Sequence, residues 1–227
     1  MLENNFFAII PMKEHSERVP NKNIREFFGK PLFYWIINTL TQIEKIEKII
    51  IDTDSEKIAN MVTDYFDVEI SIRPKELRGD FVSVNKLIGY ILNKFSKQEL
   101  FLQTHSTNPL LKKETIEKAL KFYLNNKDKY DSVFSVNRFH SRFYDKRGKP
   151  INHNPAELLR TQDLPPLFEE NSNFYIFSKA SFLKTKARIG VIPFMFETDK
   201  LESIDIDTIE DFRLAELIMI TRDKDEG

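Results

Sequence analysis

The sequence contains no cysteine among its 227 residues. Disulfide bonds, thiolate catalysis and cysteine-based zinc sites are therefore excluded, and the composition fits a reducing cytoplasm. An excess of one charge is also missing, since 34 basic residues stand against 35 acidic ones. No global field therefore draws the chain to nucleic acid or to an anionic membrane, although a small acidic ligand needs only local charge.

Long apolar runs are absent as well. The longest stretches, such as LFYWII and LIMI, fall far short of a membrane span. The first residues, MLENNFFAIIP, have no basic region and reach proline after a short apolar run, unlike a signal peptide. The P-loop signature GxxxxGK[ST] and the hydrolase signature GxSxG do not occur either. We expect a cytoplasmic protein with no membrane partner.

Short apolar runs alternate with amphipathic stretches over the first 136 residues. The runs predict buried strands at 6–10, 49–51, 68–72, 100–103 and 132–136. Helices are expected from Pro31, from a capping box at Thr53 and Glu56, and over 85–95, 114–124 and 208–221. This order favours one three-layer, Rossmann-like α/β domain over residues 1–227, with a mostly parallel sheet.

The alternation stops over about residues 137–172, where Arg, His, Asn and Pro crowd the chain and 146–150 resembles a turn. A segment this long is a functional insertion or an oligomer arm. Strands are expected to resume at 173–177 and 191–196, and 203–207 is expected to close the sheet.

Two groups of residues could carry chemistry at the carboxyl ends of the strands, where ligands bind in such sheets. The first loop brings together cations, a hydroxyl and an amide that suit a triphosphate: Lys13, Ser16, Arg18, Lys22 and Asn23. A solvated loop balanced by its own glutamates is the alternative. Asp205 and Asp207 would face one side of a strand and offer Mg²⁺ two oxygen ligands. Asp207 could also cap the last helix in a capping box with Glu210.

Longer motifs connect these groups. They are Pro11, Ser16, Pro20, Lys22 and Asn23; Gly29-Lys30-Pro31-Leu32; Asp52-Thr53-Asp54-Ser55; Arg73-Pro74-Lys75-Glu76-Leu77 with Asp80; Leu102-Gln103 through Thr107-Asn108-Pro109-Leu110; Arg160 to Pro166; Glu170 to Phe177; and Ser203 to Phe212. In this order and spacing they resemble the acylneuraminate and KDO cytidylyltransferase family over nearly the whole chain.

The resemblance implies transfer of CMP from CTP to an acidic sugar, a sialic-acid-like nonulosonate or a KDO-like acid, with release of pyrophosphate and with Mg²⁺ as cofactor. It implies that Lys13, Lys22 and Asp207 act in catalysis and that Asp205 and Asp207 hold the metal. The nucleotide site would comprise Met12, Lys13, Ser16, Arg18, Lys22, Asn23, Arg73, Asp80 and Gln103. The acceptor site would comprise Gln103, Arg142, Arg160, Gln162 and Asn171.

The first loop departs from the family pattern. Lys13 stands at the family's arginine, Glu14 and His15 at its two glycines, and Glu17 at its lysine, with Arg18 next door as a substitute. Two alternatives therefore remain open. The chain could be a nucleotidyltransferase with another acceptor, such as a phosphonate or a phosphosugar, or a non-catalytic descendant of the family.

The 137–172 insertion is expected to form a dimerisation arm. It carries apolar residues that a thin arm cannot bury alone, so a second subunit is favoured to cover them. They are Phe139, Phe143, Leu158, Leu159, Leu164, Leu167 and Phe168. A homodimer would place each arm at the partner's acceptor site, as the resemblance implies. An arm folded back on its own domain is the alternative.

Overall fold

The computed structural model of the protein describes residues 4–226, and its centre is a seven-stranded sheet in the order β5-β4-β1-β6-β8-β7-β9. The strands are β1 Phe6–Met12, β4 Ile46–Thr53, β5 Glu69–Ile72, β6 Leu100–Thr104, β7 Ser132–Phe139, β8 Leu167–Ser178 and β9 Pro193–Glu197. Strands β5, β4, β1 and β6 are parallel to one another, and β7 is parallel to β9. Only β8 runs against its neighbours, β6 and β7. The mostly parallel sheet expected from the sequence is confirmed.

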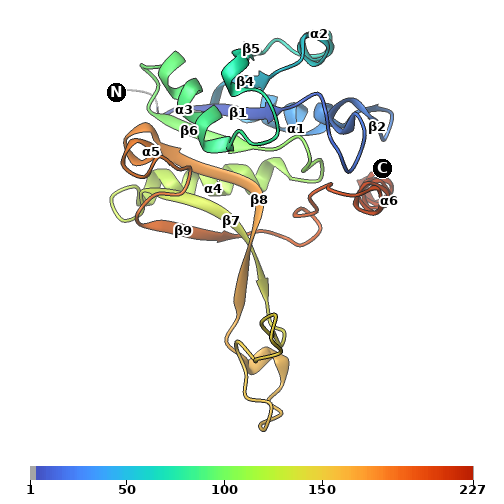
Figure 1. Cartoon of the computed structure of the whole chain (residues 1–227), viewed down its shortest axis with the longest axis vertical. Helices are drawn as coiled ribbons and strands as arrows, with labels where there is room; N and C mark the ends of the chain where they lie inside the picture. Colours follow the sequence, from blue (N-terminus) through green and yellow to red (C-terminus); the bar gives the residue numbers. More distant parts are fainter. Residues whose placement is uncertain (1–3, 227) are drawn as a thin grey trace.

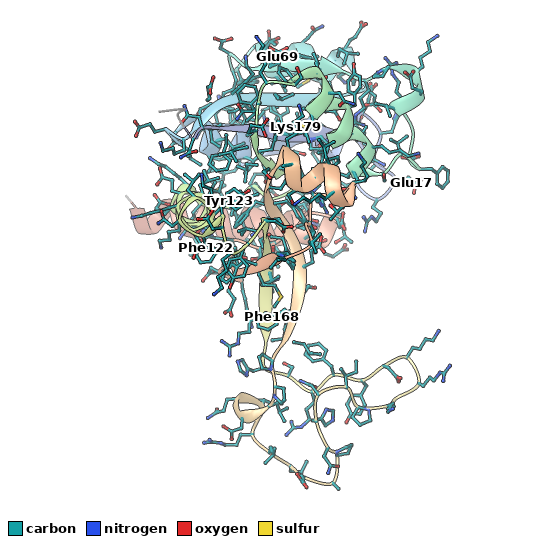
Figure 2. The ribbon with its side chains drawn as sticks, turned by 90° about the vertical axis from the view of Figure 1, so that its left-hand side faces the viewer. Glu17, Glu69, Phe122, Tyr123, Phe168 and Lys179 are labelled. Carbon is teal, nitrogen blue, oxygen red and sulfur yellow. The ribbon has the colours of Figure 1, made fainter. Side chains whose placement is uncertain are left out.

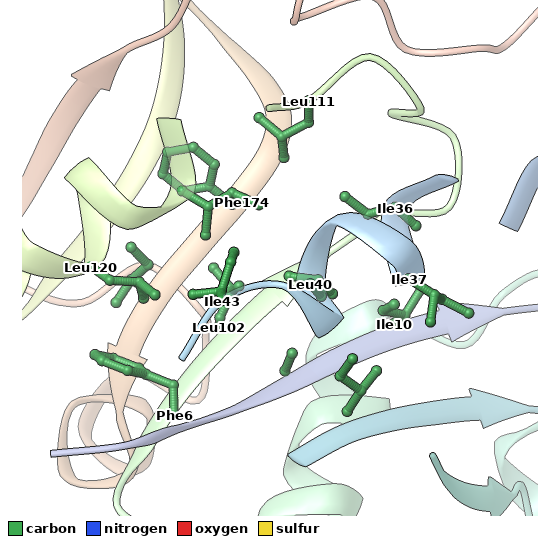
Figure 3. Close-up of a cluster of buried hydrophobic side chains, with 14 of the residues drawn as sticks. Phe6, Ile10, Ile36, Ile37, Leu40, Ile43, Leu102, Leu111, Leu120 and Phe174 are labelled. Carbon is green, nitrogen blue, oxygen red and sulfur yellow. The ribbon is translucent and has the colours of Figure 1, made fainter. Parts of the chain in front are cut away.

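Helices cover both faces of the sheet (Figure 1). They are α1 Leu32–Thr41, α2 Glu56–Thr63, α3 Val84–Lys94, α4 Lys113–Asn126, α5 Lys179–Thr185 and α6 Ile209–Glu226. Side chains alternate across a strand, so β1 supplies both layers of the core. Phe6 and Ile10 pack with α1 and α4, as Figure 3 shows, whereas Phe7 and Ile9 pack with α3 and α5. This alternation explains why the strands read as continuous apolar runs.

A smaller third cluster holds α6 against the body. Residues 26–31 form a hairpin of β2 Glu26–Phe27 and β3 Lys30–Pro31, turning through Gly29 at φ 76°. Phe27 and Leu32 then pack with Ile206 and Phe212. The segment that precedes α6 is thereby fixed beside the end of the first loop.

Two local expectations were wrong. Thr53 does not begin α2, because β4 extends through Thr53 in register with β1 and β5. Ser55 is the N-cap instead, and its hydroxyl accepts from the Ile58 N–H. Residues 203–207 are not a strand, and β9 closes the sheet. The apolar side chain of Ile206 is buried in the third cluster rather than in a sheet face.

The insertion forms an arm whose stem consists of sheet strands. The β7–β8 ladder continues past the sheet to the pair Phe139 and Leu167, so strand pairing does not stop at residue 137. Beyond the stem the chain projects from the body, as Figure 1 shows, and Figure 2 places Phe168 on the stem. Its tip turns at Gly148, within the expected 146–150 turn. Leu158 is 87% exposed, whereas Leu164 is buried.

Two short helical turns shape the loops at the carboxyl ends of the strands. They are η1 Lys22–Ile24 and η2 Lys75–Leu77, and a third, η3 Thr161–Asp163, lies on the arm. Between residues 4 and 226, no helix has the length and apolar character needed to cross a membrane.

Candidate active site

A cleft of about 450 Å³ opens at the carboxyl end of β1, where the topology predicts a ligand. The first loop forms one wall, the chain after β6 another, and the segment before α6 a third. Its lining residues are Pro11, Lys13, Ser16, Glu17, Arg18, Lys22, Asn23, Val84, His105, Ser106, Thr107, Asp205 and Asp207. The first loop and the two aspartates, more than 180 residues apart in sequence, therefore share one cleft.

Asn23 fixes the first loop in place. Its side-chain amide donates to the Lys13 carbonyl at 2.7 Å and its oxygen accepts from the Ser106 hydroxyl at 2.6 Å. The Glu14 N–H donates to Asp54 at 2.9 Å. A loop held at both ends presents its cations in a defined geometry, which a freely solvated loop would not do.

The cations of the cleft are paired with its carboxylates. Arg18 lies 2.8 Å and Lys22 3.2 Å from Asp207, and Lys22 also donates to the Ile206 carbonyl at 2.5 Å. Lys13 pairs with Asp80 at 2.7 Å, and its hydrogen bond lowers the pKa of that carboxyl. An anionic ligand that took over these cations would leave Asp80 and Asp207 without their ion-pair partners, but both carboxylates are partly exposed and can be solvated.

Asp205 and Asp207 differ in their surroundings. Burial raises the pKa of Asp205, and its Oδ1 has no hydrogen-bond partner within the described part of the chain. Asp207 is 40% exposed and carries the two ion pairs. The expected capping box of Asp207 with Glu210 is wrong, because Thr208 and Asp211 exchange the capping hydrogen bonds of α6. Asp207 is therefore free of the capping role.

Four predicted nucleotide contacts lie outside the cleft lining: Met12, Arg73, Asp80, which pairs with Lys13, and Gln103. The Met12 side chain is buried in the core beneath the sheet. Arg73 is also buried and donates from Nε to Asp52 at 2.7 Å and from Nη2 to the Asp52 carbonyl at 3.0 Å. The Arg73–Asp52 pair links the ends of β4 and β5. In this arrangement the guanidinium group of Arg73 is engaged by the protein itself.

Gln103 belongs to a polar cluster behind the wall formed by His105. Gln103 is fully buried and accepts from Arg188 Nη1 at 2.7 Å. The guanidinium group of Arg188 lies over the ring of Tyr175, 3.5 Å from the centroid, and Nη2 donates to the Tyr175 hydroxyl at 2.8 Å. Burial, then the charges of Arg188 and Lys22, lowers the pKa of His105 to about 3. His105 is therefore neutral at physiological pH.

The profile of the cytidylyltransferase family matches residues 7–224 of the chain. This chain belongs to the cytidylyltransferase family. Its relatives include the N-acylneuraminate cytidylyltransferase of Escherichia coli O18:K1:H7, which is 28% identical over 228 residues, 94% of this chain and 52% of that protein. The CMP-N,N'-diacetyllegionaminic acid synthase of Legionella pneumophila is 29% identical, covering 93% of this chain and 95% of that one. The pseudaminic acid cytidylyltransferase of Campylobacter jejuni is 24% identical, covering 93% and 94%.

The chain thus spans about half the length of the Escherichia coli relative and nearly all of the other two. Solved structures agree with the fold. A CMP:2-keto-3-deoxy-manno-octonic acid synthetase complexed with CTP matches with a TM-score of 0.70 at 12% identity, covering 96% of this chain and 99% of that one. The 4-diphosphocytidyl-2C-methyl-D-erythritol synthase of Anaerococcus prevotii matches with a TM-score of 0.66 at 15% identity, covering 96% and 97%.

The predicted acceptor residues do not gather at the cleft. Arg142 donates to the Leu159 carbonyl and Arg160 pairs with Asp163, both on the projecting arm, where Gln162 is exposed. Asn171 lies at the base of the arm, is buried, and donates to Asn137, Thr198 and Ser203. Asn171 therefore connects the arm stem, through hydrogen bonds, to the segment that leads to the cleft.

Arg188 was not predicted from the sequence, and His105 was assigned no role. Arg188 lies 85 residues from Gln103 in the chain and follows α5, a helix that the sequence analysis did not predict. A lone arginine in a short loop carries no spacing signal. His105 had one usable signal, since it stands two residues after Gln103, immediately past the end of β6.

Proposed function

We propose that this chain transfers CMP from CTP to the anomeric hydroxyl of an acidic sugar and releases pyrophosphate. The observation that carries the proposal is the cleft itself, in which three cations of the first loop face two carboxylates of the segment before α6. The names of the relatives support the substrate class, because they act on N-acylneuraminate, pseudaminic acid and a legionaminic acid derivative.

The reaction needs positioning and charge neutralisation more than covalent chemistry. The sugar oxygen attacks the α-phosphorus, the bond from that phosphorus to the bridging oxygen breaks with its electron pair leaving on pyrophosphate, and the hydroxyl proton passes to solvent. Lys13, Arg18 and Lys22 would hold the phosphate oxygens, releasing Asp80 and Asp207 from their present ion pairs. Ser16 and Asn23 lie on the same wall, where a hydroxyl and an ordered loop backbone suit further phosphate or ribose contacts.

We also propose Mg²⁺ as the cofactor, held by Asp205 and Asp207. The donor set fits, because the buried Oδ1 of Asp205 lacks a hydrogen-bond partner among the described residues and both carboxylates line the cleft. When bound, the ion would neutralise charge on the phosphates. A cation there would also favour the ionised form of Asp205, whose pKa is raised by burial.

We further propose a homodimer in which the arm of one subunit completes the acceptor site of the other. Two observations support this arrangement. The arm projects from its own body (Figure 1), and beyond its stem it carries Leu158, which is 87% exposed, close to the predicted acceptor residues Arg142, Arg160 and Gln162. Covering such apolar surface with a second subunit is favourable by roughly 25 cal/mol per Å².

The test is pyrophosphate release from CTP with a panel of acceptors: N-acetylneuraminate, pseudaminic acid, legionaminic acid, 2-keto-3-deoxy-manno-octonic acid and a set of sugar phosphates. We expect release with at least one acid and with none of the sugar phosphates. Pyrophosphate release with a sugar phosphate alone would show that the acceptor is a sugar phosphate rather than an acidic sugar. No release with any compound, from protein that binds CTP, would identify a non-catalytic member of the family.

A further inference from the structure

Arg188 lies where the acceptor side of the cleft meets the base of the arm. Its Nη1 lies 3.3 Å from Nε2 of His105, which lines the cleft, and its Nη2 lies 3.4 Å from Glu170 on the arm side of β8. The Arg188 side chain is 18% exposed, so part of it reaches solvent. A cation thus stands next to His105 of the cleft lining.

The loop that carries Arg188 is held rigidly. The Arg188 N–H donates to Asn85 at 3.2 Å, next to Val84 of the cleft wall. Asp131 accepts from the N–H groups of Val191 and Ile192 at 2.7 and 3.0 Å. Gly190 lies so close to Asp131 that an added Cβ would come within 2.2 Å of Oδ1, so a larger residue would displace the loop. A side chain held in this way loses little entropy on binding a ligand.

The polar contacts of Arg188 leave its charge only weakly paired. Glu170 approaches at 3.4 Å, at the long end of the hydrogen-bond range, and its carboxylate also accepts a short hydrogen bond from the Tyr175 hydroxyl. Gln103 and Tyr175 are neutral partners that orient the guanidinium group without neutralising it. His105 stays neutral because its pKa is lowered to about 3, so it does not compete for an anion.

We propose that Arg188 binds the carboxylate of the acidic sugar, which replaces Glu170 as its ionic partner. The proposal rests on the proposed function and specifies which residue selects an acid over a neutral sugar. A guanidinium group offers a planar pair of donors that matches a carboxylate. Gln103, fully buried and already bonded to Arg188, the Thr104 carbonyl and His105, acts as a positioning residue for that group.

The first test separates acceptor binding from nucleotide binding. Arg188→Gln is expected to raise the acceptor KM roughly ten- to a hundredfold, the loss of one charge-assisted contact, with the KM for CTP unchanged. Arg188→Lys keeps the charge but loses the planar donors, so its acceptor KM should lie between those of the wild type and Arg188→Gln. Arg213→Gln, an exposed arginine on α6, is the matched control and should leave both constants unchanged. An unchanged acceptor KM in Arg188→Gln would overturn the proposal.

Glu170→Gln distinguishes binding from a merely structural role. The substitution keeps an acceptor for the Tyr175 hydroxyl and removes the competing charge, so the acceptor KM should fall or stay the same. If Arg188 and Glu170 only stabilised the fold, both variants would raise the acceptor KM and lower the melting temperature together, and that result would refute the proposal.

A binding measurement keeps this inference separate from the proposed activity. N-acetylneuraminate and its methyl ester are titrated into the protein loaded with CMP, which cannot react. We expect the wild-type protein to prefer the acid at least tenfold and Arg188→Gln to lose the preference. A preference retained by the variant, or absent from the wild type, overturns the role of Arg188. Absence of turnover with every acid, alongside a preference that depends on Arg188, would refute the proposed function alone.

Discussion

His105 should make the stability of this protein depend on pH. Its pKa is lowered from 6.5 to about 3 by burial and by the charges of Arg188 and Lys22, so the folded chain excludes a proton that the unfolded chain accepts. Stability contributed by the neutral ring is therefore present above pH 6.5 and is lost as the pH falls toward 3. Between pH 7 and pH 5 the linkage relation gives a loss of about 2 kcal/mol from this residue alone.

The measurement is urea unfolding of the wild type and of His105→Gln at pH 7, 6 and 5. Other groups titrate in this range, so the quantity of interest is the difference in unfolding free energy between the two proteins. We expect that difference to shrink by about 2 kcal/mol on going to pH 5, equivalent to roughly 4–8 °C in melting temperature for a chain of this size. His15→Gln, at an exposed histidine of the first loop, is the matched control substitution. Parallel pH profiles for wild type and His105→Gln would refute the reasoning.

Four further predictions concern the cleft and the arm. Asp207→Asn should abolish turnover with little loss of stability, because Thr208 rather than Asp207 caps α6. Excess EDTA should abolish the turnover of the wild type. Activity that survives either treatment would exclude the metal site. Lys22→Gln should weaken CTP binding roughly ten- to a hundredfold, and Arg18→Ala should weaken it also, whereas unchanged binding in Arg18→Ala would show that Arg18 does not replace the family's lysine. Light scattering at micromolar concentration should find a dimer, and a fully active monomer would contradict it. Mixing Asp207→Asn with an inactive Arg142→Ala chain should restore part of the activity if the arm acts in trans, and no recovery despite subunit exchange would assign the arm to its own site.

The strands of the first half could be predicted because each is a short run of apolar residues, the pattern of a strand buried on both faces. Phe6 to Ile10 is apolar at every position since the two faces of β1 contact different helix layers. Reading apolar patterns as strands gave a wrong result at residues 203–207, where isoleucines alternate with aspartates and a strand was predicted. Ile206 is buried against α6 and its N–H donates to the Thr107 carbonyl, so a loop contact produces the pattern of a strand.

The residues of the candidate site also divide into those that local motifs predicted and those that depend on contacts distant in the sequence. The first loop and the two aspartates carry motifs, and the fold brings them into one cleft. Arg188 could not be predicted, because its position depends on β8 pairing with β6 and on a loop held by Asp131. The start of α2 was missed for a similar reason: pairing with β1 keeps Thr53 in the sheet and leaves the cap to Ser55.

The strand order has a consequence for synthesis on the ribosome. β7 is made before β8, yet in the sheet β8 lies between β6 and β7. β7 therefore has no partner in the body until the whole arm and β8, through Ser178, have left the exit tunnel. Until then only the parallel strands β5, β4, β1 and β6 can associate, and the free edge of β6 is open to another chain. Neighbouring nascent chains on one polysome would meet while the edge of β6 is uncovered. The risk of aggregation is therefore greatest while the arm is being translated.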